Sequence, residues 1–145
     1  MEGNARRTRR RRPGQIPDVS ALHRLSLYLP PILLAAALFI SSSRPMPQPM
    51  EDIGLSDKSL HLMAYAVFAF LVARAIYARG ISRSRTVTIA VLICGLYGVS
   101  DEIHQAFVPS RTPDVLDAWF DLAGSLLGTA AWIAAARWQR RLSRE

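Results

Sequence analysis

Ionisable side chains interrupt an apolar stretch in the last third of the chain, from Gly95 to Arg111, which reads GLYGVSDEIHQAFVPSR. With about 100° between successive residues of a helix, one broad face holds Tyr97, Gly98, Asp101, Glu102 and Gln105. Carboxyl groups in such a setting transfer protons, bind cations or pair with bases. Each charged group costs ~2.5–3.5 kcal/mol to insert at the bilayer centre, so such groups usually face the protein interior and serve function.

Two other segments supply further candidate residues. The segment DKSLHLMAY places Asp57, His61 and Tyr65 on one stripe of a helix, with Lys58 beside them. The segment DAWFDLAGSLLG forms a similar stripe, made of Asp117, Asp121, Gly124 and Gly128. Its two glycines have the GxxxG spacing, which is typical of closely packed helices in membranes.

The charges of these segments do not balance. Five acids (Asp57, Asp101, Glu102, Asp117 and Asp121) oppose two bases (Lys58 and Arg111), and five minus two leaves a surplus of three negative charges. A half-buried site cannot hold that surplus without compensation. Three solutions exist: carboxyls stay protonated, His61 and His104 become charged, or a cation binds. The structural alternative is that the acids only pair with one another and with Arg111 to hold the helices together.

Metal and serine chemistry are less well supported by the spacing. The pairs Asp57-x3-His61 and Glu102-x-His104 offer oxygen and nitrogen donors of the kind that zinc accepts, yet no strong motif such as HExxH is present. Ser100 and Ser110 flank the acids without a nucleophile elbow around them. We therefore predict neither a metal nor a cofactor. The candidate catalytic residues, with no reaction assigned, are Asp101, Glu102 and His61.

Four apolar stretches must position these residues. They span Leu25–Ile40, Leu60–Tyr77, Val87–Val108 and Val115–Ala136, and each is close to the ~20 residues that cross a bilayer. They have almost none of the polar surface that runs along every helix of a soluble bundle. The sequence therefore predicts an all-α, integral membrane four-helix bundle, although arginine-rich ends keep the mean hydropathy at only +0.15.

Local signals set the expected boundaries of these helices. Asp57 and Asp114 are the predicted N-caps of the second and fourth helices, because a carboxylate satisfies free backbone N–H groups there. Pro109 is expected to end the third helix, and Pro30 and Pro31 to lie in the first turns of the first. The lone cysteine, Cys94, reads as a small buried apolar residue without a disulfide partner.

The distribution of basic residues predicts the orientation in the membrane. All but three of the 18 lysine and arginine residues fall on one side of a four-span topology, and the exceptions are Arg44, Lys58 and Arg111. The positive-inside rule then puts both termini in the cytoplasm and the acidic helix ends outside. We expect a multi-pass protein of the cytoplasmic (inner) membrane. Its expected parts are a disordered basic arm (1–23), a four-helix membrane domain (24–138) and a basic tail (139–145).

The segments quoted above together resemble the VanZ-like family of small membrane proteins. Two positions depart from its usual pattern, because Ser110 stands in place of glycine and Asp121 in place of asparagine. The resemblance implies a polytopic envelope protein, and the member that gives the family its name is linked to resistance to the glycopeptide teicoplanin. It implies no particular reaction.

These observations lead to a functional hypothesis: an outward-facing polar pocket binds a lipid headgroup, a cell-wall precursor or a glycopeptide. Arg111 and Lys58 would hold an anionic group, while Asp101 and Glu102 orient Arg111 or bind a cationic one. The predicted ligand-binding residues are Asp57, Lys58, His61, Tyr65, Asp101, Glu102, Gln105, Arg111, Asp117 and Asp121. The alternatives are a membrane-embedded acid–base enzyme acting on a lipid or cell-wall precursor, and a proton-linked carrier.

The expected partners follow from the same pattern. Membrane lipids surround the spans, and the arginine-rich arm has no interleaved aromatic residues that could stack on bases, so no nucleic-acid partner is predicted. The oligomeric state stays open at this stage.

Overall fold

Four long helices make up the computed structural model, which describes residues 21–44, 56–109 and 111–143. They are α1 (Ala21–Ser42), α3 (Asp57–Tyr77), α4 (Arg83–Gln105) and α5 (Val115–Leu142), and the described residues contain no strand. All four are long and apolar enough to cross a membrane. The prediction of an all-α, four-span protein is therefore confirmed.

The surface of the helices is suited to lipid. Large apolar side chains are exposed along all four helices, among them Leu33, Val67, Leu96 and Leu126. In water such a surface would be an aggregation hazard, because soluble monomers rarely expose large contiguous apolar patches. The exposed side chains therefore support a multi-pass membrane protein.

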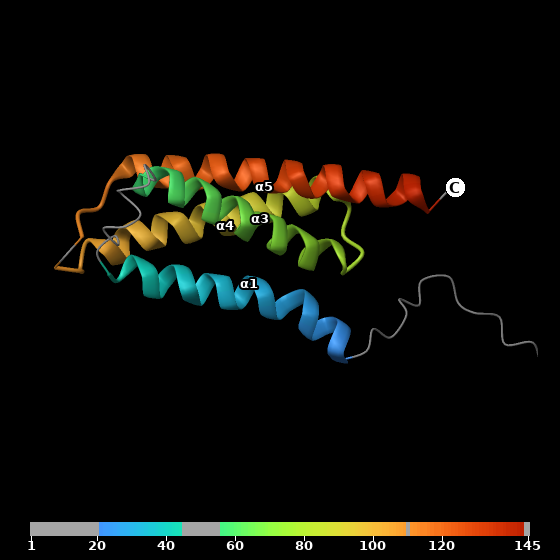
Figure 1. Cartoon of the computed structure of the whole chain (residues 1–145), viewed down its shortest axis with the longest axis horizontal. Helices are drawn as coiled ribbons and strands as arrows, with labels where there is room; N and C mark the ends of the chain where they lie inside the picture. Colours follow the sequence, from blue (N-terminus) through green and yellow to red (C-terminus); the bar gives the residue numbers. More distant parts are fainter. Residues whose placement is uncertain (1–20, 45–55, 110, 144–145) are drawn as a thin grey trace, which may run out of the picture.

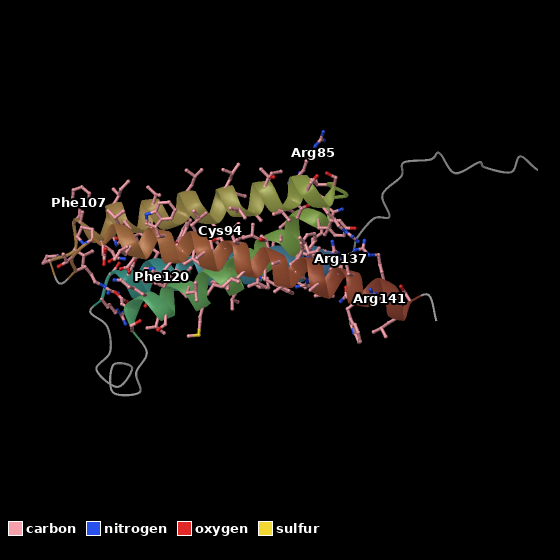
Figure 2. All side chains as sticks on the ribbon, turned by 90° about the horizontal axis from the view of Figure 1, so that it is seen from above. Arg85, Cys94, Phe107, Phe120, Arg137 and Arg141 are labelled. Atoms are coloured by element: carbon pink, nitrogen blue, oxygen red, sulfur yellow. The ribbon has the colours of Figure 1, made fainter. Side chains whose placement is uncertain are left out.

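Helices α3, α4 and α5 pack together, while α1 lies along α3 and α4 without contacting α5 in the described part of the chain (Figure 1). The first described residues and the end of α5 lie at the same end of the bundle (Figure 1). Arg137 and Arg141 lie toward that end, and Phe107 lies at the opposite one (Figure 2). Which side of the membrane each end faces stays a prediction from the charge distribution.

The N-caps agree with prediction at one helix and differ at another. Asp114 caps α5, because its side chain accepts a hydrogen bond from the backbone N–H of Leu116 at 2.9 Å. The prediction for Asp57 is wrong: Ser56 is the N-cap of α3, since its hydroxyl accepts from the Ser59 N–H at 3.2 Å. Asp57 is the first residue of the helix, and its carboxylate is free to pair elsewhere.

Two other boundaries, at the end of α4 and the start of α1, differ from prediction. Helix α4 ends at Gln105, four residues before Pro109, and the intervening residues form turns in which Val108 N–H donates to the Gln105 carbonyl. Proline disfavours helical geometry in the residue before it, which here is Val108. Helix α1 begins at Ala21, which puts Pro30 and Pro31 inside it rather than in its first turns. Helix α5 continues past the end of the apolar stretch at Ala136 to Leu142, so its last turns carry Arg137, Arg140 and Arg141.

The GxxxG spacing on α5 marks a close helix contact, as the sequence predicted. A Cβ atom added at Gly124 would collide with the backbone carbonyl of Leu62, and one at Gly128 with that of Ala66. Only glycine lets α5 approach the α3 backbone this closely. The buried core lies beside this contact and includes Tyr65, and Cys94 is fully buried there as predicted.

Candidate functional site

The ionisable residues singled out from the sequence gather at the end of the bundle where α3 and α5 begin and α4 ends. We call this group the polar cluster. It consists of Asp57, Lys58, His61, Tyr65, Asp101, Glu102, Gln105, Arg111, Asp114, Asp117 and Asp121. All ten predicted ligand-binding residues belong to it, and Asp114 is the addition. Their roles as ligand-binding residues stay a prediction.

A histidine–carboxylate pair lies at the centre of the polar cluster. His61 Nδ1 lies 2.8 Å from Asp121 Oδ1, so the ring donates a hydrogen bond from α3 to α5. The Asp121 side chain is 0% exposed and that of His61 11%. Gly98 on α4 makes room for this pair, because a Cβ there would lie only 2.6 Å from Asp121 Oδ2. The structure thus explains the glycine on the acidic face of α4.

Arg111 pairs with the first residue of α3. Its Nη1 donates to Asp57 Oδ2 at 3.2 Å, and the other Asp57 oxygen lies 4.0 Å from His61 Nε2. Of the two roles expected for Asp101 and Glu102, orienting Arg111 does not occur among the described contacts, since Arg111 pairs with Asp57, and binding a cationic group stays a prediction. The loop after α4 turns back toward the start of α3. The Asp57 carboxylate there does not act as the N-cap of α3, so it can pair with Arg111.

Lys58 pairs with two carboxylates at the start of α5. Its ammonium lies 2.7 Å from Asp114 Oδ2 and 3.5 Å from Asp117 Oδ1. The hydrogen bond from Lys58 lowers the pKa of the Asp114 carboxyl, which lies in the loop outside the spans. Lys58 and Arg111 therefore pair with different carboxylates, and their expected role in holding an anionic group stays a prediction.

The two acids of α4 are only partly satisfied. Asp101 Oδ2 accepts from Gln105 Nε2 at 3.2 Å, and Glu102 Oε2 accepts from the Asp114 backbone N–H at 2.8 Å. The other oxygen of each, Asp101 Oδ1 and Glu102 Oε1, is buried and has no hydrogen-bond partner among the described residues. The hydroxyl oxygen of Tyr65 is also buried and also lacks a hydrogen-bond partner among the described residues. Buried polar atoms are nearly always bonded, so these oxygens require an explanation.

A cavity of about 600 Å³ lies against the polar cluster, between α1, α3 and α4. Its volume falls within the range of small-molecule sites. One part of its wall is apolar and comes from α1 and α3, with Leu38, Ile40 and Leu60 among its residues. The remaining part is polar and is lined by Arg44, Asp57, His61, Tyr65, Asp101 and Arg111.

Half of the predicted ligand-binding residues reach this cavity. Asp57, His61, Tyr65, Asp101 and Arg111 line it, whereas the described wall does not include Lys58, Glu102, Gln105, Asp117 or Asp121. Two of the latter five hydrogen-bond to residues of the wall: Asp121 to His61, and Gln105 to Asp101. The polar cluster thus divides into residues on the described wall of the cavity and residues behind that wall.

The sequence did not indicate that α1 forms one wall. Ser43, just after α1, hydrogen-bonds with the His104 ring at 2.9 Å, and that ring packs on Phe39 with centroids 4.3 Å apart. Deeper in the bundle, the Tyr97 hydroxyl donates to the Ala35 carbonyl at 2.6 Å. These contacts bring Arg44 to the cavity rim. An evenly apolar helix followed by prolines carries no signal of this arrangement.

Comparison with known proteins gives the following matches. The family model described as VanZ/LLP1 matches residues 28–136, which includes most of α1 and all of α3 and α4. An uncharacterized protein of the fission yeast Schizosaccharomyces pombe is 28% identical over 105 residues, 72% of this chain and 56% of the relative. The chain therefore spans little more than half the length of that curated relative. No solved structure matches.

Proposed function

The chain belongs to the VanZ/LLP1 family, and we propose that it binds an anionic amphiphile of the cell envelope in the cavity between α1, α3 and α4. The ligand class is a molecule with a phosphate or carboxylate headgroup and an apolar chain. One observation carries the proposal: two guanidinium groups, Arg44 and Arg111, share a cavity wall with the apolar side chains of α1 and α3.

Each part of such a ligand has a matching part of the cavity. Guanidinium groups form paired, charge-assisted hydrogen bonds with phosphate and carboxylate. Arg111 Nε is buried and has no partner among the described residues, so the group keeps a donor for a ligand. Asp101 and His61 offer hydrogen bonds to hydroxyl or amino groups of the headgroup. Leu38, Ile40 and Leu60 provide the surface for an apolar chain.

The charge distribution completes the proposal with a location. If the arginine-rich ends of the chain lie in the cytoplasm, as the positive-inside rule predicts, the cavity opens near the outer surface of the cytoplasmic membrane. A ligand would enter from the outer leaflet or from the space beyond it. Lipid-linked cell-wall precursors and lipophilic glycopeptides are candidates there.

Binding can be tested with purified protein in phosphatidylcholine nanodiscs. Phosphatidic acid titrated into these discs should bind in preference to added phosphatidylcholine, as followed by native mass spectrometry. Arg111→Gln should weaken phosphatidic acid binding about tenfold, since a hydrogen bond to a charged group contributes about 1.5–3 kcal/mol. The matched control is Arg141→Gln, because Arg141 is exposed at the other end of α5. Equal losses in both variants, or no preference for the anionic lipid, would overturn the proposal.

At the level of the cell, we extend the proposal to protection against teicoplanin. Asp101→Asn should remove protection against envelope stress or teicoplanin while the amount of protein in the membrane stays unchanged. Asp101 lines the cavity and is buried, so the substitution alters the site with little change of shape. Unchanged protection, at equal abundance on a membrane immunoblot, would contradict this extension.

A second candidate function is acid–base catalysis on a lipid-linked precursor. The observation in its favour is the hydrogen bond from His61 to the fully buried Asp121, with the His61 ring on the cavity wall. A buried carboxylate that orients an imidazole is how many enzymes position a general base. Product formation from a radiolabelled polyprenyl-linked precursor, lost in His61→Asn and in Glu102→Gln, is the expected result. No turnover by the wild-type protein would contradict catalysis without affecting the binding proposal.

A further inference from the structure

We propose that His61, Asp101 and Glu102 form a binding site for one divalent transition-metal ion, of the type of Mn²⁺ or Zn²⁺, beside the polar end of the cavity, whose wall includes His61 and Asp101. The proposal goes beyond the binding of an amphiphile and does not require it. A ring nitrogen of His61 and one carboxylate oxygen from each acid lie within 4.8 Å of one another. The three side chains come from two helices, α3 and α4, which hold them in place.

The donor set selects a class of metal. One imidazole with two carboxylates suits Mn²⁺, Fe²⁺, Co²⁺ or Zn²⁺, whereas Mg²⁺ and Ca²⁺ prefer oxygen alone. Ligands about 2.1 Å from a tetrahedral ion lie roughly 3.4 Å apart. Small side-chain rotations would bring donors separated by up to 4.8 Å to that spacing.

A second observation points to a ligand at the same place. Asp101 is 4% exposed and lines the cavity, and its Oδ1 atom has no hydrogen-bond partner among the described residues. Glu102 Oε1 is buried and lacks a partner in the same part of the chain. An unsatisfied buried acceptor costs about 1–3 kcal/mol, and more when it is charged. A cation between these two oxygens would remove that cost at both.

Charge pairing leaves this part of the cluster uncompensated. The two bases of the polar cluster are already paired, Lys58 with Asp114 and Asp117, and Arg111 with Asp57. The polar cluster has six acids, and three of them (Asp57, Asp114 and Asp117) take part in these ion pairs. The remaining three are Asp101, Glu102 and Asp121, and the only other basic group beside them in the polar cluster is the imidazole of His61. A divalent ion would compensate two of those three carboxylates, which a low-dielectric site requires.

Asp121 prepares His61 for this role. Its hydrogen bond to Nδ1 at 2.8 Å puts the ring proton there and leaves Nε2 as the nitrogen able to bind a metal. Histidines that bind metals almost always donate their other ring N–H to a carboxylate, carbonyl or water. The His61–Asp121 pair has this arrangement, and Asp121 is a positioning residue that does not touch the ion.

A competing set of donors is less suitable. Asp57, His61 and Asp117 also have donor atoms within 4.8 Å of one another. Their carboxylates are engaged, however, because Asp57 holds Arg111 and Asp117 faces Lys58. A metal there would compete with two existing ion pairs. Asp117→Asn therefore separates the two sites.

The experiment uses the full chain, stripped of metal, in phosphatidylcholine nanodiscs without anionic lipid. Mn²⁺ is titrated in, and free Mn²⁺ is measured by electron paramagnetic resonance. We expect one ion per chain, which Zn²⁺ displaces and equimolar Mg²⁺ does not. Asp101→Asn and Glu102→Gln should each weaken binding at least tenfold. Asp117→Asn should leave it within about threefold, and circular dichroism checks that every variant keeps its helices.

Three results would overturn the proposal. One is the absence of saturable Mn²⁺ and Zn²⁺ binding by the helical wild-type protein. Another is weakening in Asp117→Asn with none in Glu102→Gln, which assigns the ion to the other donors. The third is full displacement of Mn²⁺ by equimolar Mg²⁺. Because these discs hold no anionic lipid, failure here is distinct from failure of the amphiphile proposal.

Discussion

Asp121 shows how one buried residue shapes the site. It uses one oxygen to orient His61, and the other oxygen lies in the space that Gly98 leaves open, with no hydrogen-bond partner among the described residues. The sequence resemblance marked this position as a departure, since asparagine is usual there. Asparagine would keep an acceptor for His61 and omit the charge.

This comparison yields a prediction about stability. Asp121→Asn should leave the free energy of unfolding within about 1 kcal/mol of wild type, because shape and acceptor persist. Asp121→Ala should lower it by about 1–3 kcal/mol, since the buried His61 N–H loses its partner. Reversible unfolding in mixed micelles, followed by circular dichroism, measures both. Equal effects of the two substitutions would show that the hydrogen bond to His61 contributes nothing.

At the scale of the element, the contact between α3 and α5 governs the geometry of the site. His61 and Asp121 come from these two helices, and Gly124 and Gly128 set how closely the helices approach. A change in that separation would alter the His61–Asp121 distance. Packing and site geometry are therefore coupled.

We predict that Gly128→Ala destabilises the protein by about 1–3 kcal/mol, because its Cβ would collide with the Ala66 carbonyl. Gly95→Ala is the matched control, since its Cβ would have only Leu122 Cδ1 nearby, at an ordinary 3.8 Å. It should change stability by no more than about 0.5 kcal/mol. Unfolding in mixed micelles tests both. Similar losses in the two variants would mean that the close contact with the Ala66 carbonyl is not the cause, because alanine has the higher helix propensity at both positions.

The elements show what the sequence can and cannot predict. The length of the apolar stretches was sufficient to predict four helices, and the GxxxG spacing was sufficient to predict a close helix contact. Both features can be read from a short segment of the sequence. The boundaries were less accurate where two residues compete for one task, as Ser56 and Asp57 do at the start of α3. The ion pairs were beyond reach, because Lys58 and Asp114 meet only through the fold. For the same reason Arg44 could not be assigned to the site.

At the scale of the whole molecule, orientation decides which compartment supplies a ligand. The start of α1 and the end of α5, which carries Arg137 and Arg141, lie at one end of the bundle, and Phe107 lies at the other (Figures 1 and 2). The positive-inside rule predicts that this is the cytoplasmic end.

Cysteine labelling tests that orientation. In a Cys94→Ala background, Phe107→Cys should react with a membrane-impermeant maleimide in intact cells, because Phe107 is 81% exposed beside the polar cluster. Arg141→Cys should react only after the membrane is opened. Cys94 is fully buried at 0% exposure, so its removal takes away background rather than a surface group. The reverse labelling pattern would turn the cavity toward the cytoplasm and contradict the proposed ligand source.

Helix α1 forms a cavity wall while contacting only α3 and α4 among the described helices. Lateral pressure from the surrounding acyl chains bears directly on its outer side, where Leu33 and Phe39 are exposed. We therefore expect bilayer thickness and acyl-chain unsaturation to change the width of the cavity. Affinities measured in thin and thick membranes should differ even when every polar contact is the same.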